Sequence, residues 1–281
     1  MIRIDKVSSE MLLSILHATH YRFSHPARYT IQHLRLTPRS DSTQQVRHWS
    51  INAPGRMSQQ VDGFGNILHT LVRDGVHQEI TINVEGLVNS EDTAGVVAHH
   101  PSEDRLPREI YLRPTRLTLP VGPVRDFAAP LTPAFAADPL DGLHRLARAV
   151  AGAVAYQKGM TDVESTAAQV LEAATGVCQD QAHVFTATAR LLGIPTRYVS
   201  GYVHVAGADA DETASHAWAE SWVEGVGWVA FDITNEICAA DAHVRLAAGP
   251  DYTYCAPVRG MRRGGGVENM DVQVSVAAVQ Q

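Results

Sequence analysis

The chain has 281 residues, of which 45% are hydrophobic and 19% charged, and its 23 Lys and Arg against 30 Asp and Glu give a net charge of -7. This is the composition of an ordinary, mildly acidic globular protein that is long enough for two domains and has no basic block for nucleic acid. Three cysteines are an odd and sparse set, which argues against a disulfide framework. The longest apolar run near the N-terminus, MLL at 11–13, is too short for a signal peptide or a membrane span. We therefore expect a cytoplasmic protein that contacts neither nucleic acid nor membrane.

The first part of the chain, residues 11–95, alternates between apolar and polar side chains, with turn clusters such as APG and DGFGN between the alternating runs. A period of two residues is typical of strands that bury one face. We predict an N-terminal β-sandwich domain over this region.

Residues 96–139 have a different composition, because eight of the 14 prolines fall there. Proline disfavours the interior of helices and of central strands. We predict an extended, proline-rich connector that lies over both domains.

A second domain is expected over residues 140–281. Apolar residues at helical spacing predict an amphipathic helix over 141–157 and a third helix over 178–192. Between them, Thr161 and Glu164 have the spacing of a capping box, which predicts that a second helix begins there. The period then changes to two and predicts strands at 197–205, 216–223, 228–232 and 272–279. Helices followed by antiparallel strands describe an α+β domain.

Cys178 lies at the predicted start of the third helix. A thiol attacks as its thiolate, and a helix N-terminus stabilises this anion through free backbone N–H groups and the positive end of the dipole. Free cysteine is also a common core residue, so a nearby base has to decide between the two interpretations. His183 is nearest in sequence, but five helical steps turn it about 140° away, and we expect it to hydrogen-bond a neighbouring segment. His216 begins a strand and can face the helix N-terminus.

Asp232 ends an otherwise apolar strand, and a buried carboxylate needs a partner. The strand that begins at His216 and the strand that ends at Asp232 are expected to form a hairpin. If its loop has an odd number of residues, Asp232 lies opposite Trp218 and diagonal to His216. Diagonal neighbours are about 7–8 Å apart at the backbone, which a carboxylate–imidazole hydrogen bond can bridge. An even loop without a bulge would place the two side chains on opposite faces of the sheet.

These positions predict Cys178 as nucleophile, His216 as base and Asp232 as the carboxylate that orients the base. Two other interpretations remain open at this point. The cysteine can be a core residue beside a solvated strand pair, or the Cys, His and Asp side chains can bind a metal ion.

Four stretches, GVCQDQAH, LGIPTRYVSGY, SHAWAE and GWVAFDITN, resemble in content and order the transglutaminase-like superfamily of papain-fold cysteine enzymes. The resemblance runs from about residue 156 to 260 and is closest to the bacterial branch with a β-rich N-terminal domain, which HATHYRFSHP, LRLTP and DGFGN also fit. It implies a papain-like catalytic core of helices packed on an antiparallel sheet. It also implies Cys178 as nucleophile, His216 as general base and then acid, and Asp232 as its orienting partner.

The sequence departs from the pattern of this branch at three positions. Ile233 stands where proline commonly follows the aspartate, Gln181 where an aromatic residue is common, and Pro250 where arginine is usual. The last two concern the expected substrate subsites.

We therefore expect acyl transfer on amide, peptide or isopeptide bonds of a peptide or protein through a thioester. We expect hydrolysis, because no feature of the sequence excludes water from the site. The alternatives are an amine transferase and a non-catalytic peptide-binding module. The backbone N–H of Cys178 should hold the oxyanion, with Tyr156 as one candidate for the second donor, although Tyr156 also fits the end of a packed helix. No cofactor or metal is expected, since the acidic loop 207–213 lacks the spacing of a calcium loop.

Overall fold

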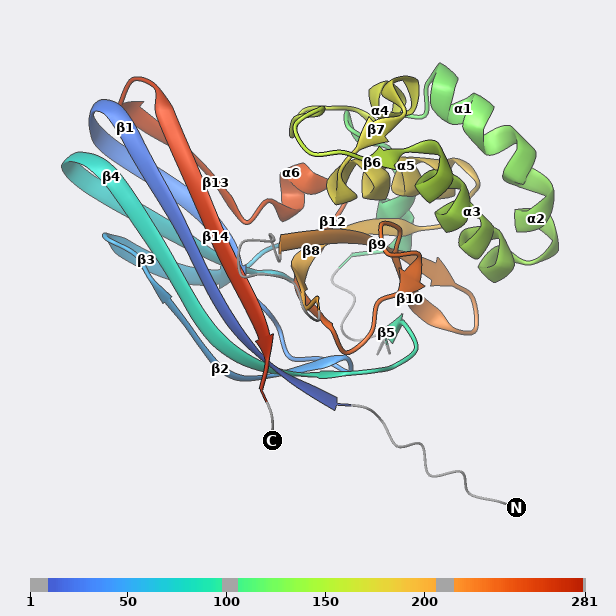
Figure 1. Ribbon diagram of the computed structural model, residues 1–281, viewed down its shortest axis with the longest axis horizontal. Coiled ribbons are helices and arrows are strands. Elements are labelled where there is room, and N and C mark those ends of the chain that lie inside the picture. Colours follow the sequence, from blue (N-terminus) through green and yellow to red (C-terminus); the bar gives the residue numbers. More distant parts are fainter. Residues whose placement is uncertain (1–9, 98–105, 206–214, 280–281) are drawn as a thin grey trace, which may run out of the picture.

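The computed structural model describes residues 10–97, 106–205 and 215–279. In Figure 1 these residues form two parts, a sheet of long strands and a core of helices and shorter strands beside it. The acidic segment 207–213 lies outside the described residues.

The long sheet is built around two antiparallel strands, β1 (Glu10–Thr37) and β4 (Ile67–Glu91). Four shorter strands pair along their outer edges: β2 (Gln44–Asn52) and β3 (Arg56–Val61) on β4, and β13 (Val258–Gly264) and β14 (Glu268–Ala278) on β1. All of them belong to one six-stranded sheet.

The apolar face of this sheet packs on the core of the molecule. Leu13, Ile15 and Ile80 from the long strands share one buried cluster with Tyr202 and Leu246 from the core. A face that carries every second side chain of several strands has to be covered to bury its apolar surface. Here residues of the core cover it, and not a second sheet formed by the N-terminal region itself.

The structure changes two expectations about domain organisation. The strands of residues 11–95 lie in a single sheet, where the sequence predicted two sheets packed as a sandwich. Residues 258–278, expected within a core of residues 140–281, complete this sheet by pairing with β1. A strand as long as β1 would otherwise expose a row of unpaired backbone groups at its edge. The C-terminal strands remove that exposed edge.

The core contains a second antiparallel sheet with helices packed on it. Its strands are β5 (Val96–Val97), β8 (Thr196–Val203), β9 (Ser215–Val223), β10 (Gly227–Asp232), β11 (Ile237–Cys238) and β12 (His243–Gly249), in the order β11-β10-β9-β8-β12 with β5 on β10. Its helices are α1 (Gly122–Ala128), α2 (Thr132–Ala137), α3 (Pro139–Ala153), α4 (Ala167–Ala173), α5 (Cys178–Leu191) and α6 (Tyr252–Cys255). Helix α5 contacts β8 and β9 as well as α1, α3 and α4 (Figure 1). The predicted α+β class is confirmed.

The region expected to be an extended connector, residues 96–139, instead contains short helices. Helices α1 and α2 have Pro123 and Pro133 in their first turn, where the missing backbone N–H costs no hydrogen bond. Val124 and Phe135 are buried in the same apolar cluster as α3 and α5. Proline therefore excluded long helices between residues 106 and 137, but the prediction of an extended connector is wrong.

The capping box was predicted at the wrong threonine. Helix α4 begins after Thr166, whose hydroxyl accepts from the backbone N–H of Gln169 while the Gln169 side chain accepts from the Thr166 N–H. The hydroxyl of Thr161 instead donates to the Asp180 carboxylate, at 2.6 Å. Thr161 therefore makes a tertiary hydrogen bond and does not cap a helix.

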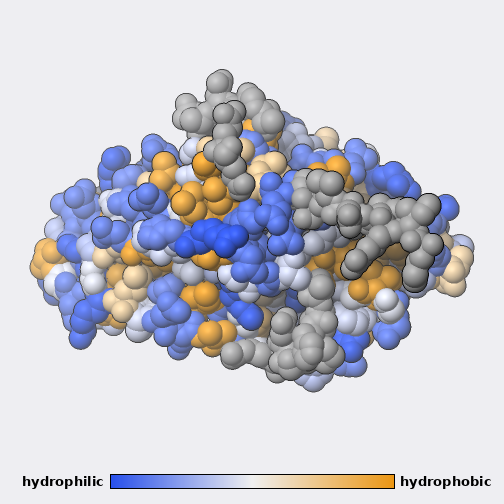
Figure 2. Space-filling view, turned by 90° about the horizontal axis from the view of Figure 1, so that it is seen from below, coloured by the Kyte–Doolittle hydropathy of each residue, from blue (hydrophilic) through white to orange (hydrophobic). Residues whose placement is uncertain are grey.

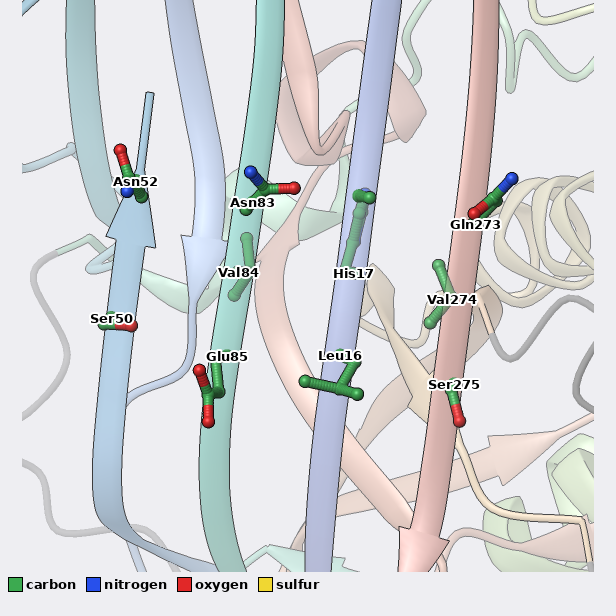
Figure 3. Close-up of a pocket in the computed structure, with 11 residues that line it drawn as sticks. Leu16, His17, Ser50, Asn52, Asn83, Val84, Glu85, Gln273, Val274 and Ser275 are labelled. Carbon is green, nitrogen blue, oxygen red and sulfur yellow. The ribbon is translucent and has the colours of Figure 1, made fainter. Parts of the chain in front are cut away.

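The surface of the molecule is mixed in character. The face shown in Figure 2 is mostly hydrophilic, with hydrophobic residues in small patches. Among the described residues, none of the helices has the length and apolar character that crossing a bilayer requires. The long sheet carries a hollow of about 560 Å³ that runs across β2, β4, β1 and β14, with polar side chains such as Asn52, Glu85 and Gln273 along it (Figure 3).

Candidate active site

The hairpin of β9 and β10 determines which side chains face each other. Residues 224–226 separate the two strands, and Phe231 pairs with Ala219. The next step of this register puts Asp232 opposite Trp218, with His216 diagonal to it. The odd loop and the predicted register are therefore confirmed.

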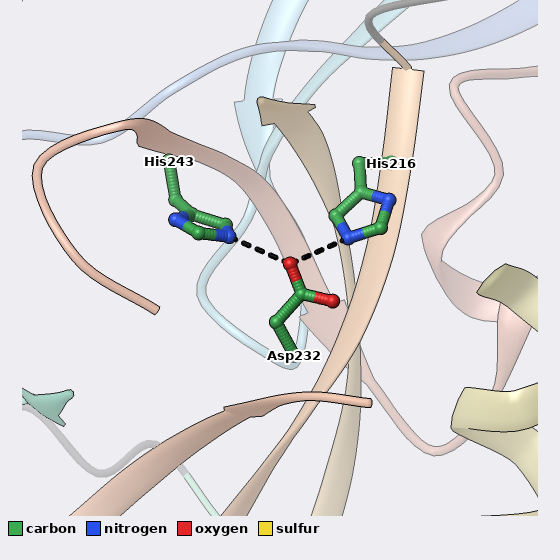
Figure 4. A group of neighbouring side chains, drawn as sticks. All are labelled: His216, Asp232 and His243. Atoms are coloured by element: carbon green, nitrogen blue, oxygen red, sulfur yellow. Dashed lines mark hydrogen bonds and ion pairs between the residues drawn. The ribbon is translucent and has the colours of Figure 1, made fainter. Parts of the chain in front are cut away.

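Asp232 is fully buried and collects hydrogen bonds from three residues. Its Oδ2 atom accepts from Nε2 of His216 at 2.8 Å and from Nε2 of His243 at 2.9 Å, which Figure 4 shows on either side of the carboxylate. Asn235 donates two more hydrogen bonds, one from its side-chain amide to Oδ2 at 2.7 Å and one from its backbone N–H to Oδ1 at 3.2 Å. Burial alone would raise the pKa of Asp232, but the two imidazoles hold it well below its usual range. The group is an ionised carboxylate that accepts at every position.

His216 lies between this carboxylate and the sulfur of Cys178. Burial by itself would lower the pKa of His216, but hydrogen bonds to Asp232 and Cys178, with the negative charges of both groups, raise it to about 10. Because Nε2 donates to Asp232, the other ring nitrogen is left for the thiol. The three predicted residues therefore meet, in the order sulfur, imidazole, carboxylate.

The local sequence holds Cys178 at the first position of α5. As a first helical residue it has a backbone N–H without a partner inside the helix. Asp180 accepts a 2.8 Å hydrogen bond from the Val177 N–H and so fixes the turn that leads into the helix. A Cβ atom at Gly176 would lie 2.7 Å from the Cβ of Asp180, so this turn requires glycine.

His183, the nearest histidine in sequence, points elsewhere. Its Nε2 accepts a 3.1 Å hydrogen bond from the backbone N–H of Tyr252, and burial lowers the pKa of His183 to about 4. The predicted hydrogen bond to a neighbouring segment is confirmed, and the structure shows in addition that His183 is fully buried.

Beside the sulfur there is a cavity of about 340 Å³ between the long sheet and the core. Cys178 and His216 line it from the core, and Tyr21 and Met270 line it from the long sheet. The reacting atoms therefore open onto a space large enough for part of a substrate.

His243 was missed in the sequence, where it is one of 14 histidines and carries no periodic signal. Its Nδ1 accepts a 3.2 Å hydrogen bond from the backbone N–H of Ala240, so the ring proton has to lie on Nε2. His243 is thereby held as a permanent donor to Asp232. Asn235, also missed, follows Asp232 by three residues, a spacing at which a side chain can reach back across a turn.

His216, Asp232 and His243 also form the one cluster, among the described residues, with metal-ligand geometry, their candidate atoms lying within 4.8 Å of one another. A metal would need the lone pair on Nε2 of His243, but the Ala240 N–H fixes a proton there. The 2.8 and 2.9 Å contacts are hydrogen bonds to a common acceptor. The donor set thus does not fit a metal ion.

Two substitutions at His243 should separate the effect of its hydrogen bond to Asp232 on activity from the effect of its size. We expect His243→Leu to lower kcat/KM about 10- to 100-fold, because a hydrogen bond to a charged group is worth about 1.5–3 kcal/mol. His243→Gln can still donate to Asp232 and accept from Ala240, so it should retain most of the activity. Steady-state rates at several pH values measure this; equal losses in both variants would contradict the donor role.

The sequence matches two protein families: the "Transglutaminase-like superfamily" over residues 125–233 and the "Bacterial transglutaminase-like N-terminal region" over residues 13–89. An uncharacterized protein of Mycobacterium leprae is 30% identical over 94% of this chain and 98% of its own length. The chain belongs to the transglutaminase-like superfamily. An uncharacterized protein of Mycobacterium tuberculosis is likewise 30% identical, over 94% of this chain and 91% of its own.

Among solved structures, a proposed cysteine protease from Cytophaga hutchinsonii is similar in fold, with a TM-score of 0.76 at 20% identity over 98% of this chain and 92% of that one. The resemblance inferred from the motifs is confirmed, and so is a transglutaminase-like, papain-like core behind a β-rich N-terminal region. Membership of this superfamily supports a cysteine-dependent enzyme.

Two of the three departures from the pattern of this branch, Gln181 and Pro250, make hydrogen bonds within the core. Gln181 is buried, donates to the Val154 carbonyl at 2.8 Å and accepts from the Thr234 hydroxyl at 2.6 Å. It therefore ties α5 to the turn after Asp232. The Pro250 carbonyl accepts from Arg190 at 2.7 Å. Neither side chain is among those that line the cavity beside the sulfur.

Tyr156, the candidate second oxyanion donor, lies in β6 (Ala155–Tyr156), which pairs with β7 (Thr175–Gly176) directly before Cys178. It is 49% exposed, so the alternative of a packed helix end is wrong. Its backbone pairs with Gly176, two residues before Cys178, but it is not among the residues that line the cavity beside the sulfur.

The ion pair of His216 and Asp232 is expected to stabilise the fold only within a limited range of pH. Asp232 has a lowered pKa, so its contribution is present above the ordinary value of 3.8 and lost as the pH falls through the folded value. His216 has a raised pKa, so its contribution is complete below 6.5 and lost as the pH rises towards about 10. The difference in free energy of unfolding between wild type and Asp232→Asn should therefore be largest between about pH 4 and 6.5.

Urea titrations across this range test that window. Burial lowers the pKa of His17 and of His183 to about 4, but both are present in wild type and variant, so their effect cancels in the difference. A difference that stays constant from pH 5 to 10 would contradict the assigned ion pair.

Proposed function

We propose that this protein hydrolyses amide, peptide or isopeptide bonds of a peptide or protein through a thioester on Cys178. The observation that carries the proposal is the line of sulfur, imidazole and buried carboxylate at the N-terminus of α5, open to a cavity. An imidazole held between a thiol and a carboxylate is the arrangement that activates a sulfur nucleophile.

At the start of the first half of the reaction the proton of the Cys178 thiol has passed to His216, and the sulfur attacks the carbonyl carbon. The oxyanion that forms accepts a hydrogen bond from the free backbone N–H of Cys178, and Tyr156 is the candidate for the second donor. The C–N bond then breaks, and the amine leaves with the proton from His216.

In the second half a water molecule loses a proton to His216 and attacks the thioester carbon. The C–S bond breaks, the carboxylic acid leaves, and the proton returns to the sulfur. Asp232 holds the ring orientation and stabilises the imidazolium in both halves.

The acyl acceptor decides between a hydrolase and a transferase. Water is the more concentrated acceptor, which favours hydrolysis, while an amine bound in the cavity would make the protein a transglutaminase. Peptide and glutamine-containing libraries, incubated with and without a primary amine, separate these outcomes by mass spectrometry. Cleavage or deamidation supports the proposal, an amine adduct supports the transferase, and no change of mass supports a non-catalytic binding module.

The compartment is proposed to be the cytoplasm, because all three cysteines are free thiols and suit a reducing environment. Fractionation of cells followed by immunodetection tests this.

A further inference from the structure

The cavity beside Cys178 has walls from two distant parts of the chain. One wall carries Cys178 and His216, and the facing wall belongs to the long sheet, in which Tyr21 pairs with Met270 and Thr19 with Val272. Met270 and Val272 are two residues apart on β14, so their side chains point to the same face. The C-terminal strand therefore contributes directly to the space in front of the sulfur.

The described residues that line this cavity carry no formal charge apart from the histidines and Cys178. Within the described part of the chain, no Asp, Glu, Lys or Arg lines it; the lining includes the apolar Val177, Val258, Met270 and Val272 and uncharged polar residues such as Thr19 and Ser200. Moving a charged side chain from water into such surroundings costs free energy unless a partner is present. The hollow across the long sheet differs, because it includes Glu85 and contains neither Cys178 nor His216 (Figure 3).

Met270 adds a second observation at the rim of the cavity. The residue is 56% exposed although it is apolar and lines the same cavity as Cys178 and His216. Exposed apolar side chains next to a concave site are typical of surfaces that bind a ligand.

We propose that this cavity binds an uncharged, apolar side chain on the acyl side of the scissile bond, and that Met270 helps to set this preference. The acyl part is favoured over the leaving amine because it stays attached to Cys178 until the second half of the reaction, so only its binding serves both steps. This inference rests on the function proposed above and names its substrate class.

Peptidyl acyloxymethyl ketones test the inference without knowledge of the natural substrate. Cys178 attacks the methylene carbon beside the ketone, a C–S bond forms, and the carboxylate leaves with the bonding electrons. Probes that differ only in the side chain next to the ketone, Leu, Phe, Asp or Lys, are compared by their rates of labelling. Iodoacetamide, which is too small to use the cavity, reports the intrinsic reactivity of the sulfur.

Met270→Lys and Met261→Lys form a matched pair of variants. Met261 is also an exposed methionine of the long sheet, at 71%, but it does not line the cavity. Wild type should react about tenfold faster with the Leu and Phe probes than with the charged ones. Met270→Lys should lose about tenfold with the apolar probes and gain with the Asp probe, while Met261→Lys and the iodoacetamide rates stay unchanged.

Three results would count against the inference. Equal labelling by all four probes, or equal behaviour of the two lysine variants, overturns the inference and leaves the proposed function intact. Labelling by iodoacetamide but by none of the peptidyl probes contradicts the proposed function itself, and the inference fails with it.

Discussion

Cys178→Ala should lower the turnover of amide substrates by about 10⁴-fold or more, because the variant has no atom that can form the thioester. The substitution removes one sulfur from the first turn of α5 and leaves the helix and both imidazoles in place. Steady-state kinetics with the best substrate from the peptide libraries, together with the melting temperature, measure the effect.

Cys238→Ala is the matched control for this change. Cys238 is a free and partly buried thiol of the same domain, and it does not line the cavity of the reacting groups. Its variant should keep wild-type activity. Retained turnover in Cys178→Ala would show that another group forms the covalent bond.

Asp232→Asn should lower kcat/KM by about 10³-fold and also destabilise the fold. Among the described residues, every hydrogen-bond partner of this carboxylate is a donor: His216, His243, and the side-chain amide and backbone N–H of Asn235. An amide at this position has to point its own N–H₂ at one of these donors. The ring of His216 then loses both its orientation and the charge that stabilises its protonated form.

Asp41→Asn is the control that separates activity from stability. Asp41 also forms a largely buried ion pair, with Arg245 of β12, but it is not among the residues that line the reactive cavity. We expect this variant to be less stable and fully active at low temperature. Equal losses of activity in the two Asp variants would mean that Asp232 acts only through stability.

The parts of the site that could be predicted from the sequence depend on local patterns. The period of two residues and the three-residue loop fix the register of β9 and β10, and this register brings His216 to Asp232. The glycine-containing turn and the apolar spacing after it place Cys178 at the start of a helix. Each of these signals lies within a few residues of the group that it positions.

The parts that could not be predicted depend on contacts between distant segments. The return of β13 and β14 to β1 joins residues more than 200 positions apart, and no local pattern specifies that pairing. His243 becomes a partner of Asp232 only through the order of strands in the core sheet. Thr161 has the sequence spacing of a helix cap, but in the fold its hydroxyl donates to Asp180, which is distant in sequence.

The same distant pairing brings the long sheet to the candidate active site. Because β14 pairs with β1, the sheet presents Met270 and Tyr21 to the cavity in front of the sulfur. A core without its N-terminal and C-terminal strands would have an open groove there. The region matched by the bacterial N-terminal description, residues 13–89, is thus part of the site as well as of the fold.

The acyl-enzyme itself is the most direct test of the account. Wild-type protein is mixed with a peptide p-nitrophenyl ester that ends in leucine, quenched in acid within one turnover and measured by intact mass spectrometry with peptide mapping. We predict a single acyl adduct on Cys178 that is absent in Cys178→Ala and forms much more slowly in Asp232→Asn. An adduct on any other residue, or release of product from Cys178→Ala at the wild-type rate, would contradict the account.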